Sequence, residues 1–281
     1  MRHLRAIAGI VAALVPVAAL ADDETPPVVG GHTYVQHLIV AAKAKYPAIA
    51  AITVESKREK GDGLIVLGST ARIASVMTSV THPAPDGVVG STVREAFNSS
   101  SGHRLGTIEI KFKTAGAANA ATAAAVQSDL AKATLSAKNA ADAWPFDKAF
   151  GPDTYAQTLT MKTVARYPDL LVMMVHATPP GAKRNVVIGS NIGRFGKAAD
   201  EDDLRVIDKG STNLEVGSDN DRFETELPLL DAHGVRIGAL GLVFPFKASD
   251  DKEAIHRRGL AIRDELASAI PNNAALFARA K

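Results

Sequence analysis

Tyr34-Val-Gln-His-Leu38 recurs 121 residues later as Tyr155-Ala-Gln-Thr-Leu159. Tyr46-Pro47 recurs as Tyr167-Pro168 at the same spacing, with no insertion or deletion between the two matches. Repeats of about 20–50 residues are typical of solenoids and propellers, whereas a repeat this long indicates a duplicated domain. The chain is therefore predicted to contain two related domains in tandem.

Two further matches extend the repeat. Leu64-Ile-Val-Leu-Gly-Ser-Thr70 corresponds to Asn185-Val-Val-Ile-Gly-Ser-Asn191 in the same register. Gly102-His-Arg-Leu-Gly106 corresponds to Gly234-Val-Arg-Ile-Gly238 at an offset of 132 residues, so the second copy has gained about eleven residues in between. Neither copy carries a recognisable catalytic motif, and the duplicated unit is predicted to be a binding fold.

Residues 1–21 have the pattern of a secretory signal peptide. Met1-Arg-His-Leu-Arg5 is positively charged, residues 6–20 are apolar, and Ala19-Leu-Ala21 provides a cleavage site of small residues. An uncleaved membrane anchor is the alternative, but the apolar run contains Pro16 and is shorter than the roughly 20 residues that a span needs. We expect cleavage at this site and a periplasmic or secreted protein.

Charge and cysteine content exclude several classes of protein. The whole chain has 32 Lys and Arg against 30 Asp and Glu, and loss of Arg2 and Arg5 with the signal peptide balances the two. A balanced chain has no electrostatic footprint for nucleic acid or for an anionic membrane. The absence of cysteine excludes disulfides, thiol chemistry and cysteine-ligated zinc.

The first half of each copy is predicted to be a helix followed by two strands. Residues spaced four apart and followed by proline indicate an amphipathic helix that ends at the Tyr-Pro pair. These residues are Tyr34, Leu38, Ala42 and Tyr46 in the first copy and Tyr155, Leu159, Thr163 and Tyr167 in the second. Strands are predicted at 48–56 and 169–177, each with a hairpin partner that ends in Gly68-Ser69 or Gly189-Ser190.

The second half of each copy is predicted to contain a crossover, two strands and a helix. The crossovers, 71–91 and 192–220, lack strand periodicity and are expected to form helical turns and loops. Two strands follow in each copy, joined at Gly102 and Gly234. A helix is then expected over 117–141 in the first copy, and after the capping pattern Asp250-x-x-Glu253 in the second.

The last strand differs between the copies. Ile108, Ile110 and Phe112 alternate with charged residues, as in a sheet with one solvated face. The second copy has Gly241 and Val243 at the alternating positions. We therefore expect the outer face of the second sheet to be covered by the other domain, a terminal helix or a second subunit.

This order of elements resembles that of PAS-like sensor domains. Asp231-Ala-His-Gly-Val-Arg-Ile-Gly-Ala-Leu-Gly-Leu-Val243 is similar to the turn and final strand of extracytoplasmic Cache domains, which often have an acidic residue, two glycines and alternating apolar residues there. The resemblance covers most of residues 32–270. It implies an α+β fold of two tandem PAS-like domains, 32–145 and 146–281, each an antiparallel sheet with flanking helices.

The chain departs from tandem Cache sensors in three respects. Each copy begins with its own short helix, whereas those sensors usually share one long N-terminal helix. No kinase, cyclase or methyl-accepting region follows the second copy, and the arginine–tryptophan–tyrosine motif of amino-acid-sensing members is absent. A signal would therefore have to be relayed by a partner, such as a membrane-bound signalling protein.

By the same resemblance, the ligand pocket lies between the inner face of the sheet and the crossover, which in the second copy begins Gly189-Ser-Asn-Ile-Gly-Arg-Phe-Gly196. A glycine-rich turn exposes backbone N–H groups, and an arginine can bind a carboxylate or phosphate through two hydrogen bonds. The expected ligand is a small molecule with an anionic group, and the candidate ligand-binding residues are Arg194, Ser190, Asn191, Phe195 and His176. The alternative is that the glycines only turn the chain, the arginine is solvated and the histidine is structural.

No metal, cofactor or catalytic residue is predicted. No two histidines have the spacing of a metal site, and neither Asp200-Glu-Asp-Asp203 nor Asp219-Asn-Asp221 has a downstream acidic ligand at EF-hand spacing. Gly189-Ser-Asn-Ile-Gly193 misses the Gly-x-Ser-x-Gly nucleophile elbow by one position.

The sequence therefore favours a periplasmic or secreted small-molecule-binding, sensor-type protein without catalytic activity, and no nucleic acid partner. One alternative is an interaction protein that uses the covered sheet face to bind a partner or a second copy. An unrecognised hydrolase is a further alternative. A homodimer is compatible with each of these.

Overall fold

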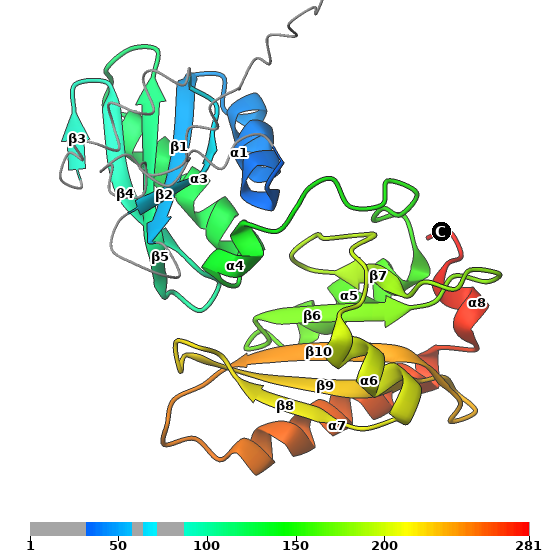
Figure 1. The fold of residues 1–281 in the computed structure, drawn as a ribbon. Coiled ribbons are helices and arrows are strands. Elements are labelled where there is room, and N and C mark those ends of the chain that lie inside the picture. The colour runs from blue at the N-terminus through cyan, green and yellow to red at the C-terminus, as the bar shows by residue number, and fades with distance from the viewer. Residues whose placement is uncertain (1–31, 58–63, 72–86, 281) are drawn as a thin grey trace, which may run out of the picture.

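The computed structural model describes residues 32–57, 64–71 and 87–280. Over these residues the chain is α+β, with two five-stranded antiparallel sheets and seven helices (Figure 1). None of the described helices combines the length and the hydropathy that crossing a bilayer requires. The predicted signal peptide, 1–21, and most of the first crossover, 71–91, lie outside the described residues.

The first sheet has the strand order β2-β1-β5-β4-β3. Its strands are β1 (Ile49–Lys57), β2 (Leu64–Ser69), β3 (Gly87–Val89), β4 (Thr92–Asn98) and β5 (Arg104–Phe112). The helices α1 (Tyr34–Lys45) and α3 (Asn119–Ala133) cover one face, and the short helix α4 (Ala137–Ala140) follows α3. Ile39, Ile108 and Leu130 belong to the buried core between these helices and the sheet.

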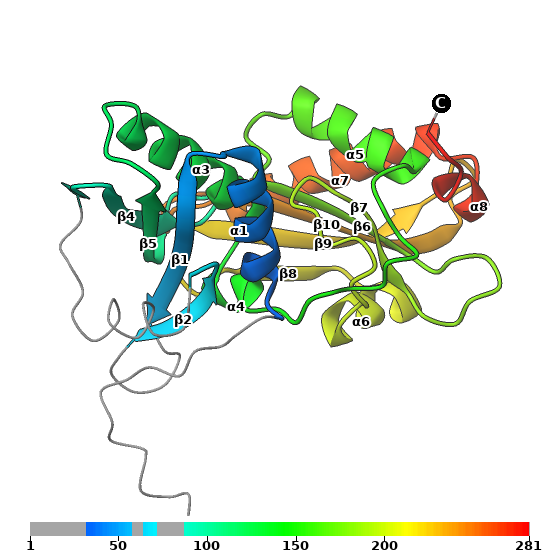
Figure 2. The ribbon, with the colours of Figure 1, turned by 90° about the horizontal axis from the view of Figure 1, so that it is seen from above.

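The second sheet repeats this arrangement as β7-β6-β10-β9-β8. Its strands are β6 (Val172–Ala177), β7 (Val186–Ser190), β8 (Asn213–Val216), β9 (Arg222–Leu230) and β10 (Arg236–Pro245). The helices around it are α5 (Tyr155–Arg166), α6 (Glu201–Lys209), α7 (Lys252–Ala269) and the short α8 (Asn273–Leu276). Figure 2 shows α5 and α7 on one face of the sheet and α6 on the other.

The predicted helices and strand pairs are confirmed in order, but two short strands in the crossovers are not predicted. One is β3, which lies inside the predicted first crossover, 71–91. Both opening helices end at the residue before the Tyr-Pro pairs, and the four predicted strand pairs are present. The second crossover contains the strand β8 beside the helix α6, although no strand is predicted there. Four residues are too few for an alternating pattern to be recognised.

Two helix boundaries differ from the prediction. The helix predicted over 117–141 is divided into α3 and α4, and the Ser136 side chain caps the second piece by accepting from the N–H of Asn139. The N-cap of α7 is Asp251, not Asp250. The Asp250 carboxylate instead accepts a hydrogen bond from the N–H of Lys247 in the preceding turn.

A glutamine explains the best-preserved part of the repeat. The Gln36 side chain accepts a hydrogen bond from the N–H of Ser69 at 2.7 Å and donates one to its carbonyl at 3.1 Å. Gln157 makes the same two bonds with Ser190, at 2.8 and 3.1 Å. The amide thereby satisfies backbone groups at the edge of the sheet and fixes the opening helix against the second strand. The glycine before each serine leaves room for this close packing.

A second pair of glycines lies where the last strand of each sheet passes the first. A Cβ atom added at Gly106 would lie 1.9 Å from the carbonyl oxygen of Glu55, and one added at Gly238 would lie 1.9 Å from that of His176. The obstacle is backbone, so rotation of a side chain cannot relieve it. Both sheets therefore require glycine at this position.

We expect Gly238→Ala to lower the free energy of unfolding by about 2–3 kcal/mol, the upper part of the range for overpacked sites. Gly151→Ala is the matched control, because a Cβ at Gly151 meets no atom within 4 Å. The control should change stability by less than about 0.5 kcal/mol. Urea denaturation measures both variants, and equal stabilities would contradict the close approach of the two strands.

Candidate functional site

A cavity of about 270 Å³ lies on the face of the second sheet opposite α5 and α7. Met174 and His176 line it from β6, and Glu224 and Glu226 line it from β9. The segment after β7 and the start of α6 form a second wall. The cavity thus lies between the sheet and the crossover, but on the outer face of the sheet. The pocket implied by the resemblance lies on the inner face, and that part of the prediction is wrong, because the core under α5 and α7 fills the inner face.

The first domain closes the cavity. The residues that it contributes are Leu135, Ser136, Lys138, Asn139 and Asp142, from α4 and the residues on either side of it. Leu135 also packs against Val172 and Val243 of the second sheet. The outer face of this sheet is therefore covered, as its apolar alternation predicts, and the cover is the first domain together with the crossover.

Arg194 lies at the junction of the two domains and is 6% exposed. Its guanidinium forms an ion pair with Asp142 of the first domain, and Lys197 lies 3.6 Å from the same carboxylate. Arg194 has a φ of 72°, which is uncommon for a residue with a side chain. The hydroxyl of Tyr34 in α1 donates a hydrogen bond to the carbonyl of Ile192, so the first domain holds this turn at two points.

Burial shifts the titration of both groups without changing their charge at neutral pH. It lowers the pKa of Arg194 to about 10 and raises the pKa of Tyr34 to about 12, where the nearby guanidinium opposes the rise. Arg194 therefore stays positively charged and Tyr34 neutral. The Nε atom of Arg194 is buried and has no hydrogen-bond partner among the described residues, so one donor of the guanidinium is unused.

The sheet side of the cavity is acidic. Glu224 and Glu226 lie two residues apart on β9, and neither forms an ion pair within the described part of the chain. Burial, followed by the carboxylates of Glu215 and Asp203, raises the pKa of Glu224 to about 7. Burial and then Glu224 raise the pKa of Glu226 to about 8, although its carboxylate accepts a hydrogen bond from Asn213.

His176 is a buried neutral imidazole on the same face. It is 4% exposed, and burial lowers its pKa although Asp203 acts in the opposite direction. Its Nδ1 atom lies 3.4 Å from the Asp203 carboxylate but has no hydrogen-bond partner among the described residues. His176 and Arg194 are thus the two predicted site residues that the fold brings to the cavity.

Ser190 and Phe195 do not line the cavity, although both are predicted to be ligand-binding residues. The hydroxyl of Ser190 accepts a hydrogen bond from the N–H of Ile192 at 3.2 Å, and Ser190 is 1% exposed. Phe195 is partly buried elsewhere in the turn. The glycine–serine pair therefore fixes the start of the crossover.

Asn191 is likewise outside the cavity. Its side chain accepts a hydrogen bond from the N–H of Met173 and donates one to the carbonyl of Leu171, each at 2.9 Å. These bonds fasten the crossover to the edge of β6. Asn191 thereby positions the turn that carries Arg194.

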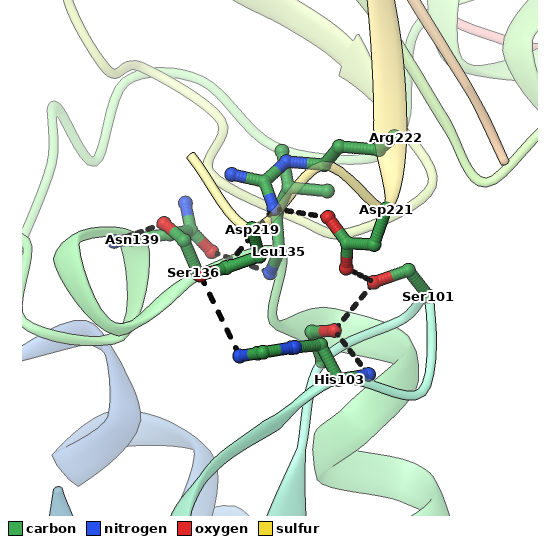
Figure 3. A network of polar contacts seen from close by, with 9 residues as sticks. Ser101, His103, Leu135, Ser136, Asn139, Asp219, Asp221 and Arg222 are labelled. Carbon is green, nitrogen blue, oxygen red and sulfur yellow. Dashed lines mark hydrogen bonds and ion pairs between the residues drawn. The ribbon is translucent and has the colours of Figure 1, made fainter. Parts of the chain in front are cut away.

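A second contact between the domains joins the β4–β5 turn to the β8–β9 turn (Figure 3). The Ser101 hydroxyl donates to the Asp221 carboxylate, and His103 Nε2 lies 3.5 Å from the Asp219 carboxylate. The ligand atoms of His103, Asp219 and Asp221 lie within 4.8 Å of one another, as a metal site would require. Arg222, however, already pairs with both carboxylates, at 3.0 Å from Asp221 and 3.5 Å from Asp219, so the cluster serves as a contact between domains.

The equivalent face of the first sheet carries its own counter-charge. Arg94 of β4 is 5% exposed and lies 2.8 Å from the carboxylate of Glu55 on β1 and 3.3 Å from that of Glu109 on β5. The alternation of Glu109 with Ile108 and Ile110 predicts a solvated face. The buried ion pairs of Arg94 are therefore not predicted from the sequence.

Removal of this arginine leaves the buried Glu55 without its cation. We expect Arg94→Met to lower the free energy of unfolding by about 3–5 kcal/mol, the usual cost of breaking a buried ion pair. Arg166→Met is the matched control, because Arg166 pairs with Glu265 at the surface and such pairs contribute at most about 1 kcal/mol. A loss as small as that of the control in urea denaturation would show that Glu55 is solvated.

Glu224 and Glu226 should make stability depend on pH. Their folded pKa values of about 7 and about 8 exceed the usual 4.5, so the folded state holds protons that the unfolded chain releases. Their favourable contribution is full below pH 4.5 and is lost as the pH rises through 7 and 8. The double variant Glu224→Gln, Glu226→Gln should match the wild type near pH 5 and exceed it by about 2 kcal/mol near pH 8.5. Thermal unfolding at both pH values measures the difference, and an equal offset at both would contradict the shifted pKa values.

Comparison with known proteins assigns no family. No protein-family model matches the chain, and no curated protein matches it. Function is therefore inferred from the cavity and from the differences between the two copies.

Proposed function

We propose that this protein binds a small molecule in the second domain, as a sensor-type protein without catalytic activity of its own. The observation that carries the proposal is a cavity closed by both domains and lined by buried polar atoms of His176 and Arg194 that lack partners among the described residues. Ligand sites are concave and place a few polar groups against an otherwise packed wall. The shared strand order of the two sheets supports the PAS-like, Cache-type resemblance.

Ligand binding would act on the arrangement of the two domains. A ligand in the cavity touches α4 from the first domain and β9 from the second, so it favours the domain positions that bring both walls to it. A ligand shifts an equilibrium by its difference in affinity for the two states. A partner, such as a membrane-bound signalling protein, would read the favoured state, and the predicted signal peptide places this event in the periplasm or outside the cell.

The interaction-protein alternative relies on the covered face of the second sheet. That face is occupied by Leu135 of the first domain and by Ile192 of the crossover, so a partner or a second copy would need another surface. An anionic ligand, expected from the arginine, would have to displace Asp142 from Arg194. The cavity is thus better suited to a ligand that leaves this ion pair in place.

The test is a thermal-shift screen of residues 22–281 against amino acids, short carboxylates, amines, purines and sugars. A ligand at a hundredfold over Kd stabilises the folded state by about 2.7 kcal/mol, which raises Tm by several degrees in domains of this size. We expect one class to give such a shift. Arg194→Ala should reduce it, because this variant removes the contact that ties the crossover to the first domain.

Arg184→Ala is the matched control. Arg184 also pairs with an aspartate, Asp147 at 2.9 Å, but its side chain is exposed and does not line the cavity. This variant should bind like the wild type. The absence of a shift with every class of compound would contradict the proposed function.

A further inference from the structure

The two domains carry different residues at three equivalent positions on the sheet face opposite the long helices. In the first domain these residues are Glu55, Arg94 and Glu109, and in the second they are His176, Glu226 and Gly241. The first pair follows from the offset of 121 residues. The others follow from strand register, because Arg94 faces Glu109 as Glu226 faces Gly241.

These differences remove a cation and a side chain from the second domain. In the first domain, the Arg94 guanidinium lies between two carboxylates. In the second, the carboxylate of Glu226 stands at the position of this arginine, and the facing residue is Gly241. The glycine places no side chain at this position, and a Cβ added there would be in van der Waals contact with Glu224 Oε1 at 3.4 Å. The cavity therefore lies on the sheet face that corresponds to the face of Arg94 in the first domain.

The charges around the cavity do not balance. Seven carboxylates and three Lys or Arg side chains line it. Arg194 and Lys197 both lie at Asp142, and Lys138 is exposed. Within the described residues, neither Glu224 nor Glu226 forms an ion pair, although the charge of Arg222 lowers the pKa of Glu224 against the larger effect of burial.

Unpaired polar atoms in the same wall point independently to a ligand. His176 is 4% exposed and lines the cavity, and its buried Nδ1 has no hydrogen-bond partner among the described residues. The Nε atom of Arg194, which is 6% exposed, is in the same situation. Folded proteins leave few buried polar atoms unpaired, and the exceptions need an explanation. A molecule held in the cavity provides one.

We propose that the second domain binds a small organic cation, whose ammonium group lies between Glu224 and Glu226 and replaces the guanidinium that Arg94 supplies in the first domain. This inference rests on the ligand-binding function proposed above. The volume of about 270 Å³ is below the roughly 300–1,000 Å³ of sites for drug-sized ligands. A short alkylamine or diamine fits this space, whereas a nucleotide or a peptide does not.

A bare metal ion suits the cavity less well. Among the described residues, the acidic and histidine side chains whose ligand atoms converge are His103, Asp219 and Asp221, outside the cavity. The carboxylates of the cavity are spread around its wall. An ammonium group has three N–H donors that point in different directions, and it can reach separated acceptors.

The affinity for such a cation should depend on pH, because ammonium binding favours the ionised form of both glutamates. Their pKa values are raised by burial, so the empty cavity holds protons that the ligand must displace at low pH. The charged and titratable groups that face them from the surrounding elements are Glu215, Asp200, Asp203, Arg222, Arg194, Lys197, His176, Lys138 and Asp142. Affinity should therefore rise between about pH 6 and about pH 8.5.

Four probes of similar size test the charge of the ligand: n-butylamine, 1,4-diaminobutane, butyrate and 1-butanol. Calorimetric titration of residues 22–281 should show binding of at least one amine and no binding of butyrate or butanol. The double variant Glu224→Gln, Glu226→Gln should weaken amine binding at least tenfold. Glu201→Gln is the matched control, because this exposed residue of α6 carries the same charge and does not line the cavity.

Glu226→Arg restores the residue type of the first domain and serves as a second variant. A tethered guanidinium should occupy the cavity, abolish amine binding and preserve or raise Tm. Retention of wild-type amine affinity in either glutamate variant would overturn the inference, and so would silence with both amines. Binding of Ca²⁺ or Zn²⁺ that the double variant loses would overturn it in favour of a metal site. If butyrate binds instead and Arg194→Ala abolishes its binding, the ligand-binding function stands and the inference about charge is wrong.

Discussion

A charge buried against a sheet needs a counter-charge. Both domains have buried carboxylates on the sheet face opposite their long helices. The effective cost of removing one ion from water is several kcal/mol. The first domain meets the need internally, because Arg94 lies between Glu55 and Glu109. The second domain has acidic side chains on the same face without such an arginine, and the raised pKa values of Glu224 and Glu226 show that the empty site is protonated more readily than free glutamate. One constraint thus yields a first domain whose buried carboxylates have an arginine between them and a second domain whose buried glutamates have raised pKa values.

The first domain contacts the second at several points around the cavity. Its α1 helix holds the crossover turn through Tyr34, and Asp142 neutralises Arg194 in that turn. Leu135 seals the apolar side of the covered face. The turns that meet in Figure 3 fix the opposite end of the interface. The cavity is therefore a property of the pair of domains, since neither contributes a complete wall.

Much of the fold is predictable from the sequence because the repeated residues act on structure close to them in the chain. The helix, the proline after it and the glycine–serine pair recur together, since Gln36 and Gln157 dock each helix on the same strand position. The covered outer face follows from Val243 in the last strand.

The site is only half predictable from the sequence. His176 is predicted from its place in a buried strand, and Arg194 from its place after one. Ser190 and Asn191 are wrongly predicted, because the polar side chains that bind ligands also hydrogen-bond to the backbone of turns. Glu224 and Glu226 are missed because alternating charge on a strand normally indicates a solvated face. Only the packing of the first domain on this face, a contact between residues far apart in the chain, places them at a cavity.

The two short helices α4 and α8 are equivalent in the repeat but have different contacts. Each has four residues and follows the long helix of its domain. The chain after each returns to the threonine before the opening helix, through the bridges Thr33–Ala143 and Thr154–Arg279. Yet α4 lines the cavity of the following domain and α8 does not, so the copies meet head to tail through different surfaces instead of about a two-fold axis. In a symmetric pair, every substitution at the contact would change both partners at once. Here the α4 surface that closes the cavity and the sheet face that it covers belong to different copies, so a substitution in one changes the cavity without changing the other.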